Sequence, residues 1–362
     1  MNLKELRILQ MIDSLEVGGA ERMAVNLANT FTEQGIVNKL IVSRNDGPLT
    51  KLVRNQESVR ILGKKSTFDI KAFRKLISEV KSFKPDIFHI HGTSIYWGVG
   101  LKFFFPKVKL IWHDHLGISP EVITENPRSE LKWIGKNIDF IITANESTAE
   151  FWKEKRIIRD SSIKYLSNFP YLKIEEKVKT DTFTFLHLAN YRSEKGQMNI
   201  VNACKILKDK GYSFQVRMVG QRVDKNWEEK VSSKIKDLDL NSDVALEGPS
   251  DNVAKVLTQV DAGLVASDRE GLPVALLEYG LAGLPVISTN VGQCAEVLGK
   301  GDFGILVPVN NPEEMAKAME HLISLPDKGV ALGENLQIQV KNHYGELQFI
   351  SEYQNVINSL FK

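Results

Sequence analysis

Cysteine is scarce in this chain of 362 residues, which contains only Cys204 and Cys294. Two isolated cysteines cannot form a disulfide framework, and they are too few for a cysteine-based zinc site. Such low cysteine usage is typical of proteins in a reducing compartment. We therefore expect a cytoplasmic location.

Long hydrophobic runs are also missing. A membrane-spanning helix needs about 18 or more apolar residues in succession, and the best candidate, 95–105, is short and contains Lys102. The first ten residues include Lys4, Glu5 and Arg7 and have no apolar core of the kind found in secretory signals. The sequence predicts a soluble protein, or one attached only to the inner surface of the cell membrane.

Charge is nearly balanced over the whole chain but not between its halves. The net charge is +2, yet residues 1–170 contain 26 Lys and Arg against 19 Asp and Glu, whereas residues 171–362 contain 21 against 26. A basic half joined to an acidic half indicates that the halves meet different partners. Random variation in surface charge is the alternative explanation.

The length and the alternation of strand-like with helix-like patterns predict two consecutive domains. The first half contains two amphipathic helical patterns, at 20–31 and 70–83, and several buried strand-like runs. These runs lie at 7–12, 39–43, 86–90, 109–112 and 138–143. Strands that alternate with helices favour an α/β fold with a parallel, doubly wound sheet, which we assign to residues 1–172.

The pattern begins again after the polar segment 173–181, which we interpret as a linker. A helical pattern at 195–208 and five strand-like runs predict a second α/β domain over 182–340. The runs lie at 183–188, 213–219, 244–247, 262–266 and 285–288. Residues 341–362 are expected to end in a helix that packs back on the first domain. In such sheets ligands bind beyond the carboxyl ends of the strands.

The most informative segment is 267–278, with the sequence SDREGLPVALLE, which follows a buried strand and opens a helix. Pro273 is expected at the first helical position, and Gly271 lets the backbone approach a ligand closely. The free N–H groups of the helix start suit a diphosphate or sugar hydroxyls. Eight helical residues separate two side chains by about 12 Å, so Glu270 and Glu278 suit two ends of one elongated ligand. A solvated helix start is the alternative.

Several motifs occur together in a fixed order along the chain. The set resembles the signature of the large retaining glycosyltransferase family four, and it extends over most of the sequence. Its members are Gly18-Gly19-Ala20-Glu21, Lys195-Gly196, Glu270-x7-Glu278 with Gly271, Leu272 and Pro273, Ala282-Gly-Leu-Pro-Val286, and Gly292-x3-Glu296. The resemblance implies a GT-B fold, in which two doubly wound Rossmann-like domains face a central cleft.

The resemblance also implies a role for each motif of the second domain, which would bind a nucleoside diphosphate sugar. Glu278 would contact the ribose, and Glu270 the sugar. Lys195 and the loop of Gly271, Leu272 and Pro273 would contact the diphosphate. A lysine there would stabilise the charge that develops as the nucleotide leaves. A surface lysine at a helix start is the alternative.

Two further positions qualify this assignment. Most relatives carry an arginine five residues before the lysine, but here that position is Asn190, so Arg192 is the candidate substitute. Gly18 and Gly19 follow the first strand without the full G-x-G-x-x-G spacing, so a bound dinucleotide is not favoured. The resemblance implies that this loop faces donor and acceptor; a glycine pair that only makes a tight turn is the alternative.

Four of the seven histidines end two neighbouring strand-like runs, at His89, His91, His113 and His115. The members of each pair are two residues apart, so their side chains lie on the same side of the sheet. A metal site, a hydrogen-bonded core and a sugar contact are all compatible with this pattern. The resemblance assigns the sugar contact to the histidine that ends the fourth strand, which His115 matches best, with His113 as the register-shifted alternative.

No metal cofactor is expected for the transfer. Asp237-Leu-Asp239 matches the D-x-D pattern of metal-dependent transferases, but it lies at the end of a helix rich in Lys and Glu. We interpret it as a solvated helix terminus, and we expect helix dipoles and Lys195 to stabilise the leaving diphosphate instead.

The first domain combines cations with aromatic residues. Residues 102–109 read KFFFPKVK, and the helical region 64–84 contains seven basic residues against two acidic ones. This composition suits the surface of an anionic membrane. A buried helix end that runs into a strand is the alternative.

Together these observations predict a transferase that moves a sugar from a nucleoside diphosphate sugar to a glycan or polyprenyl-linked acceptor. The resemblance implies that the transfer retains the anomeric configuration and belongs to bacterial cell-surface polysaccharide biosynthesis. No nucleic acid partner is expected. No residue stands out as a covalent nucleophile, which favours a front-face reaction. A nucleotide-sugar epimerase of the same architecture and a catalytically silent nucleotide- or glycan-binding subunit are the alternatives.

Overall fold

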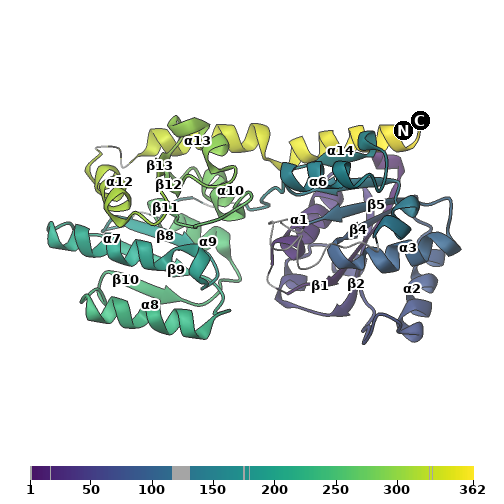
Figure 1. Cartoon of the computed structure of the whole chain (residues 1–362), viewed down its shortest axis with the longest axis horizontal. Coiled ribbons are helices and arrows are strands. Elements are labelled where there is room, and N and C mark those ends of the chain that lie inside the picture. Colours follow the sequence, from purple (N-terminus) through teal and green to yellow (C-terminus); the bar gives the residue numbers. More distant parts are fainter. Residues whose placement is uncertain are drawn as a thin grey trace. The chain divides into compact units, whose positions relative to one another are not determined.

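A computed structural model describes residues 2–16, 18–115, 131–173, 176–178, 180–325, 327 and 329–362. The chain divides into two compact units (Figure 1). The first comprises Met1–Phe169 and Glu346–Lys362, and the second Pro170–Gly345. The polar segment 173–181 therefore belongs to the second unit.

The first unit contains a seven-stranded parallel sheet in the order β3-β2-β1-β4-β5-β6-β7. Its strands are β1 (Arg7–Ser14), β2 (Val37–Asn45), β3 (Val59–Ile61), β4 (Ile87–His91), β5 (Lys109–Asp114), β6 (Phe140–Thr143) and β7 (Ile163–Tyr165). The order changes direction at β1, whose neighbours are β2 and β4. This is the topology of a doubly wound sheet, with a switch point between β1 and β4.

Helices cover both faces of this sheet. They are α1 (Gly19–Glu33), α2 (Ile70–Phe83), α3 (Ile95–Phe104), α5 (Leu131–Ile134), α6 (Glu146–Lys155) and α14 (Glu346–Leu360). One apolar core lies between the sheet and α2, α3 and α6, and α1 covers another. The alternation of short buried strands with amphipathic helices produces this layering, because each helix buries one apolar face against the sheet.

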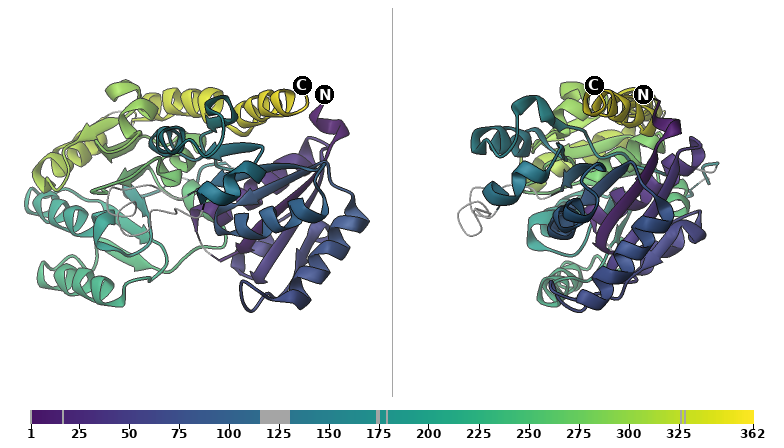
Figure 2. Two further views of the ribbon diagram at one scale, coloured as in Figure 1. Left: turned by 45° about the vertical axis from the view of Figure 1, so that its right-hand side comes forward. Right: turned by 90° about the vertical axis from the view of Figure 1, so that its right-hand side faces the viewer.

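The last helix of the chain, α14, packs on the first unit (Figure 2). Phe349 and Tyr353 are buried there, and the Tyr353 ring lies 5.6 Å from the ring of Phe31 in α1. The backbone N–H of Leu3 donates a hydrogen bond to Gln354 Oε1 at 2.9 Å. Residues from both ends of the sequence thus complete one unit.

The second unit contains a six-stranded parallel sheet in the order β10-β9-β8-β11-β12-β13. Its strands are β8 (Thr184–Leu188), β9 (Gln215–Val219), β10 (Val244–Glu247), β11 (Ala262–Val265), β12 (Val286–Thr289) and β13 (Ile305–Val307). Its helices are α7 (Gln197–Asp209), α8 (Lys225–Asp237), α9 (Val253–Thr258), α10 (Val274–Leu281), α11 (Cys294–Val297), α12 (Pro312–Ser324) and α13 (Val330–His343). Buried apolar clusters lie on both faces of the sheet.

The fold class predicted from the sequence is confirmed: both units are α/β with parallel, doubly wound sheets. The sequence patterns did not predict β3, β7 and β13. Each of these strands has only three residues and lies at an edge of its sheet, so its side chains show too little periodicity to be recognised. Within the described ranges, no helix is long and apolar enough to cross a membrane.

Candidate functional site

The loop between β11 and α10 carries Glu270, the first of the two predicted carboxylates. Glu270 Oε1 lies 2.5 Å from Lys195 Nζ and accepts a hydrogen bond from Ser267 Oγ at 2.8 Å. The structure therefore brings together two predicted site residues that are 75 positions apart. Ser267 lies in the segment that the sequence singled out, but no pattern in the sequence assigned it a role.

Lys195 is held beside this loop by a close backbone contact. It ends a short 3-10 helix, Ser193–Lys195, and is followed by Gly196, whose φ of +70° is in the left-handed region. A Cβ atom at Gly196 would lie only 1.9 Å from the carbonyl oxygen of Ala266. Only glycine fits both the φ angle and the space, so the Lys195-Gly196 motif positions the lysine through its glycine.

Gly292 gives the Glu270 loop a second backbone neighbour. Its φ is +50°, and a Cβ atom there would lie 2.3 Å from the carbonyl oxygens of both Glu270 and Gly271. The N–H of Gln293 donates a hydrogen bond to Gly271 O at 2.9 Å. Loops that follow β8, β11 and β12 thus pack against one another at the carboxyl edge of the sheet, where ligands of doubly wound folds bind.

The helix start is displaced by one residue from the prediction. α10 begins at Val274, and Pro273 is its N-cap, because a ψ of 120° places this residue in extended backbone. Leu272 packs against the apolar core of the unit. Glu278 lies in the second turn of α10 and is 6% exposed, so the two carboxylates come from different elements. Their contacts to two ends of one ligand stay a prediction.

Asn190 occupies the position at which the resemblance implies an arginine. The backbone carbonyl of Asn190 accepts a hydrogen bond from Gln197 Nε2 at 3.0 Å, and its side-chain Oδ1 accepts one from the N–H of Gln221 at 3.1 Å. Arg192 is exposed and lies 3.8 Å from Glu194. The substitution of Arg192 for the missing arginine stays a prediction.

The glycine pair that follows β1 lies in the first unit. Gly18 is the N-cap of α1 with a φ of −162°, which is ordinary extended backbone. Neither Gly18 nor Gly19 has a positive φ, and a Cβ atom at Gly19 would meet no atom within 4 Å. The backbone angles therefore do not support the alternative of a tight turn that requires glycine, although a Cβ atom at Gly18 would lie 2.2 Å from Glu21 Oε2. Their contact with a ligand stays a prediction.

The four histidines form a packed group beneath α14. His89 Nε2 lies 3.2 Å from His113 Nδ1, and His89 Nδ1 lies 3.0 Å from the hydroxyl of Tyr353. His91 Nδ1 lies 2.8 Å from His115 Nε2. Burial lowers the pKa of His89 and of His115 to about 3, and holds the pKa values of His91 and His113 well below the usual range. All four rings are therefore uncharged at neutral pH.

The two candidates for the sugar contact differ in their surroundings. His113 lies within β5, is fully buried, and its ring stacks 6.3 Å from that of Phe349. His115 follows the end of β5 and is only partly buried. This difference favours His115, whose contact with the transferred sugar stays a prediction.

The Asp237-Leu-Asp239 segment is a solvated helix terminus, as the sequence indicated. Asp237 ends α8, and the Asp239 side chain is 94% exposed, 3.4 Å from Lys208 Nζ. Asp239 also has a φ of +56°, typical of a residue that follows a helix. The pair does not lie at the carboxyl edge of the sheet.

The cationic and aromatic segment 102–109 combines a mostly buried lysine with a partly exposed one. Lys102 Nζ lies 2.8 Å from Asp139 Oδ2 and donates a hydrogen bond to the carbonyl of Val108, and its side chain is only 12% exposed. Lys109 also faces Asp139. Lys102 is thus mostly buried in an ion pair, as the alternative of a helix end that runs into a strand implies, whereas Lys109 is 33% exposed and 4.0 Å from Asp139. The role of this segment in a membrane-facing surface stays a prediction.

Other residues nearby form an exposed apolar surface, here called the α2–α3 patch. Its members are Phe68, Ile70, Phe103 and Phe104, each at least 60% exposed. Phe73 of α2 joins the two helices, since its ring lies 5.3 Å from Trp97 and 6.0 Å from Phe104 of α3. Exposed cations border the patch on α2 at Lys71, Arg74 and Lys75.

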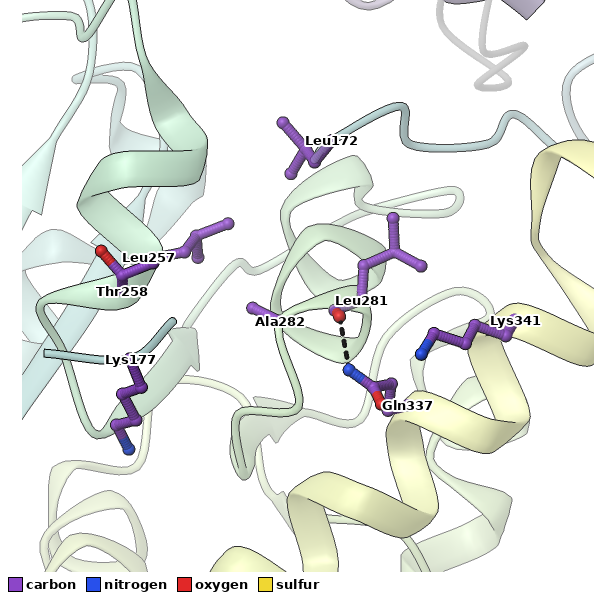
Figure 3. Close-up of a pocket in the computed structure, with 8 residues that line it drawn as sticks. All are labelled: Leu172, Lys177, Leu257, Thr258, Leu281, Ala282, Gln337 and Lys341. Atoms are coloured by element: carbon purple, nitrogen blue, oxygen red, sulfur yellow. Dashed lines mark hydrogen bonds between the residues drawn. The ribbon is translucent and has the colours of Figure 1, made fainter. Parts of the chain in front are cut away.

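A pocket of about 430 Å³ opens elsewhere in the second unit (Figure 3). It is lined by Leu172, Lys177, Leu257, Thr258, Leu281, Ala282, Gln337 and Lys341. The carbonyl of Leu281, the last residue of α10, accepts a hydrogen bond from Gln337 Nε2 at 2.7 Å. Because Glu270 precedes the start of α10 and the pocket lies at its end, this pocket is separate from the site around Lys195.

Comparison with protein families identifies the chain. Residues 17–169 match the model described as "Glycosyltransferase Family 4", and residues 170–339 match "Glycosyl transferases group 1". The two matches are contiguous and together cover residues 17–339, the larger part of each unit. The chain belongs to the family-4 glycosyltransferases. The resemblance carried by the ordered motifs is thereby confirmed.

Characterised and solved relatives agree with this membership. The glycosyltransferase is 24% identical to an N-acetyl-alpha-D-glucosaminyl L-malate synthase of Bacillus anthracis, over 80% of this chain and 78% of that protein. It is 32% identical to a putative colanic acid biosynthesis glycosyltransferase of Salmonella typhimurium, over 36% of this chain and 34% of the relative. The structure of Anabaena HepE in complex with UDP and glucose superposes with a TM-score of 0.79 at 17% identity, covering 98% of this chain and 100% of HepE. This likeness shows that the fold is GT-B.

Proposed function

We propose that this glycosyltransferase moves a sugar, with retention of anomeric configuration, from a nucleoside diphosphate sugar to a glycan or polyprenyl-linked acceptor. The observation that carries the proposal is the Lys195–Glu270 pair, 2.5 Å apart, held by three loops at the carboxyl edge of the second sheet. HepE, a structural neighbour, binds UDP and glucose, which supports a nucleotide-sugar donor. The colanic acid relative supports a role in cell-surface polysaccharide biosynthesis.

The residues around the pair would divide the donor between them. Lys195 would stabilise the departing diphosphate, because a compact ammonium group interacts most strongly with the diphosphate when negative charge develops on it. Glu270 would accept hydrogen bonds from the sugar, and Glu278 from the ribose. Arg192 and the N–H groups at the start of α10 would neutralise the diphosphate. His115 would also contact the sugar.

The reaction would follow a front-face route. In this route the bond between the sugar and the leaving phosphate breaks on the side from which the acceptor hydroxyl approaches. The leaving phosphate accepts the proton of that hydroxyl, so that no residue forms a covalent bond to the sugar.

A nucleotide screen tests the donor assignment. A ligand at 100 times its dissociation constant adds about 2.7 kcal/mol to the stability of the state that binds it. We expect at least one nucleoside diphosphate to raise the unfolding temperature of the full chain, whereas the matching nucleoside does not. Absence of a shift with every diphosphate and nucleotide sugar would contradict the proposal.

Glu278→Ala is expected to weaken nucleoside diphosphate binding about 10- to 100-fold, since a hydrogen bond to a charged acceptor contributes about 1.5–3 kcal/mol. Titration calorimetry with the best diphosphate of the screen measures the effect. Glu320→Ala is the control, because Glu320 pairs with Lys210 in the same unit at 2.6 Å and lies outside the site. Unchanged affinity in a folded Glu278→Ala protein would remove the ribose assignment.

Transfer is expected to survive chelation. Among the described residues, the D-x-D segment is a solvated helix terminus, and the diphosphate is assigned to Lys195 and a helix start instead. The assay compares turnover before and after treatment with EDTA. Loss of activity that Mn²⁺ or Mg²⁺ restores would show that the reaction needs a divalent ion.

A peripheral membrane attachment would account for the α2–α3 patch, and it would bring the enzyme to a lipid-linked acceptor on the cytoplasmic face. Exposed aromatic rings insert into the interfacial zone, and each nearby cation adds about 1 kcal/mol of attraction to an anionic surface. The patch supplies both kinds of residue, with Phe103 75% and Phe104 60% exposed.

Sedimentation with liposomes tests this attachment. We expect binding to vesicles with anionic lipid at low salt and release at high salt, because salt screens the attraction. Replacing both Phe68 and Phe103 by serine should abolish the binding and leave nucleotide affinity unchanged. Ile338→Ser, an exposed apolar residue of the second unit, serves as the control. If the wild-type protein ignores anionic vesicles at low salt, the membrane proposal fails.

A further inference from the structure

Three histidines of the first unit form a compact nitrogen-rich centre. His89 and His91 lie on β4 and His113 on β5, and all three are at most 1% exposed. Each offers a ring nitrogen, and the three nitrogens lie within 4.8 Å of one another. We call these three residues the histidine centre. The proposed sugar transfer does not require three histidines at this position.

One pair of nitrogens in the centre has the spacing of metal ligands, and the separations to the third nitrogen are at most 4.8 Å. His89 Nε2 and His113 Nδ1 are 3.2 Å apart. Two imidazole ligands of a tetrahedral zinc ion, with Zn–N distances of about 2.0–2.1 Å, are separated by about 3.3 Å. His115 adds a fourth imidazole beside the centre, with Nε2 2.8 Å from His91 Nδ1.

In two of the rings, the nitrogen that points away from the centre has a hydrogen-bond partner that orients it. The Tyr353 hydroxyl lies 3.0 Å from His89 Nδ1, and Gln10 Oε1 lies 3.1 Å from His91 Nε2. Metal-bound histidines usually hold their second ring nitrogen in such a hydrogen bond, which fixes the ring and makes it a better ligand. These two contacts leave His89 Nε2 and His91 Nδ1 as the nitrogens that face the other rings.

His113 differs from the other two rings in the nitrogen that points away from the centre. Among the described residues, His113 Nε2 is buried and has no hydrogen-bond partner. A metal ion bound at Nδ1 would not pair this nitrogen, so it is the cluster of three nitrogens and the hydrogen bonds of His89 and His91 that indicate a metal site. The described contacts of the three rings outside the centre are to Gln10, His115, Phe349 and Tyr353, and none of these residues carries a carboxylate.

We propose that His89, His91 and His113 bind one divalent transition-metal ion. Imidazole favours Zn²⁺, Cu²⁺, Ni²⁺ and Co²⁺ over Mg²⁺ or Ca²⁺, so the ion belongs to the first group. The site goes beyond sugar transfer, and the ion takes no part in the reaction. Its role is to join β4 and β5 beneath α14, which contacts the centre through Tyr353.

Cobalt is the probe that tests this proposal. The full chain is stripped with chelator, freed of the chelator by dialysis, and titrated with Co²⁺ while the visible absorption is followed. We expect one equivalent to bind with the intense bands of a four-coordinate ion, and one equivalent of Zn²⁺ to remove them. Zn²⁺ should also raise the unfolding temperature.

Two variants and a control separate this site from other histidines of the chain. His113→Gln should abolish the cobalt spectrum, and Tyr353→Phe, which only removes a hydroxyl, should weaken cobalt affinity about 10- to 100-fold. His187→Gln, at a buried histidine of the second unit, should leave the affinity unchanged. Absence of stoichiometric cobalt binding, or binding that Tyr353→Phe and His113→Gln leave unaltered, would overturn the proposal.

Discussion

Replacing Lys195 by alanine should lower kcat about 100-fold while changing the dissociation constant of the donor less than tenfold. A group that stabilises charge developed only in the transition state contributes mainly to turnover, and removal of one such group typically costs a factor of about 10²–10³. Lys195 suits this role because Glu270, at 2.5 Å, fixes its ammonium at the carboxyl edge of the sheet. Steady-state kinetics combined with calorimetric donor binding measures both constants.

Lys210→Ala provides a matched control for this variant. Lys210 also pairs with a glutamate of the second unit, Glu320, at 2.6 Å, but it is not part of the loops around Lys195. We expect turnover close to that of the wild type. If Lys195→Ala raises KM alone and leaves kcat unchanged, the lysine binds the ground and transition states equally, and its assignment to the departing diphosphate fails.

Replacing Gly196 by alanine is expected to lower the free energy of unfolding of the second unit by about 3 kcal/mol or more. A left-handed conformation costs a residue with a Cβ atom about 1–2 kcal/mol, and forcing extra atoms into a packed site adds about 1–3 kcal/mol. Both apply here, since the new Cβ would lie 1.9 Å from the carbonyl oxygen of Ala266. Urea denaturation followed by circular dichroism measures the loss.

Gly211→Ala separates the two contributions. Gly211 has a similar φ of +84°, but a Cβ atom there would meet nothing within 4 Å. We expect a loss of only about 1–2 kcal/mol, the cost of the backbone conformation alone. Donor affinity should fall in Gly196→Ala and not in Gly211→Ala, because only Gly196 supports the loop that carries Glu270. Equal losses in both variants would contradict the close approach at Ala266.

The longer elements could be predicted from the sequence because their side chains repeat often enough to reveal a period. The pattern at 70–83 coincides with α2, and that at 244–247 with β10. The three-residue edge strands could not be predicted, because they are too short to show a period. The displacement of α10 by one residue reflects the ψ angle of Pro273, which sequence alone does not determine.

Contacts between distant residues mark the limit of the sequence-based prediction. The motifs indicated Lys195 and Glu270 separately, but their direct pairing depends on packing at Gly196 and Gly292. Lys102 shows the reverse case. Its neighbours in sequence suggested an exposed cation, whereas its partner Asp139 is 37 positions away and draws the side chain inward. Local composition predicts neither contact.

The most direct test of the central claim is product analysis by nuclear magnetic resonance after incubation with the preferred nucleotide sugar and a glycan or polyprenyl-linked acceptor. The account predicts that nucleoside diphosphate is released only when acceptor is present, and that the new glycosidic bond has the anomeric configuration of the donor. An inverted product would contradict retention. Conversion of the donor into its epimer without transfer, or binding of the donor without any turnover, would contradict the assignment of this protein as a retaining glycosyltransferase.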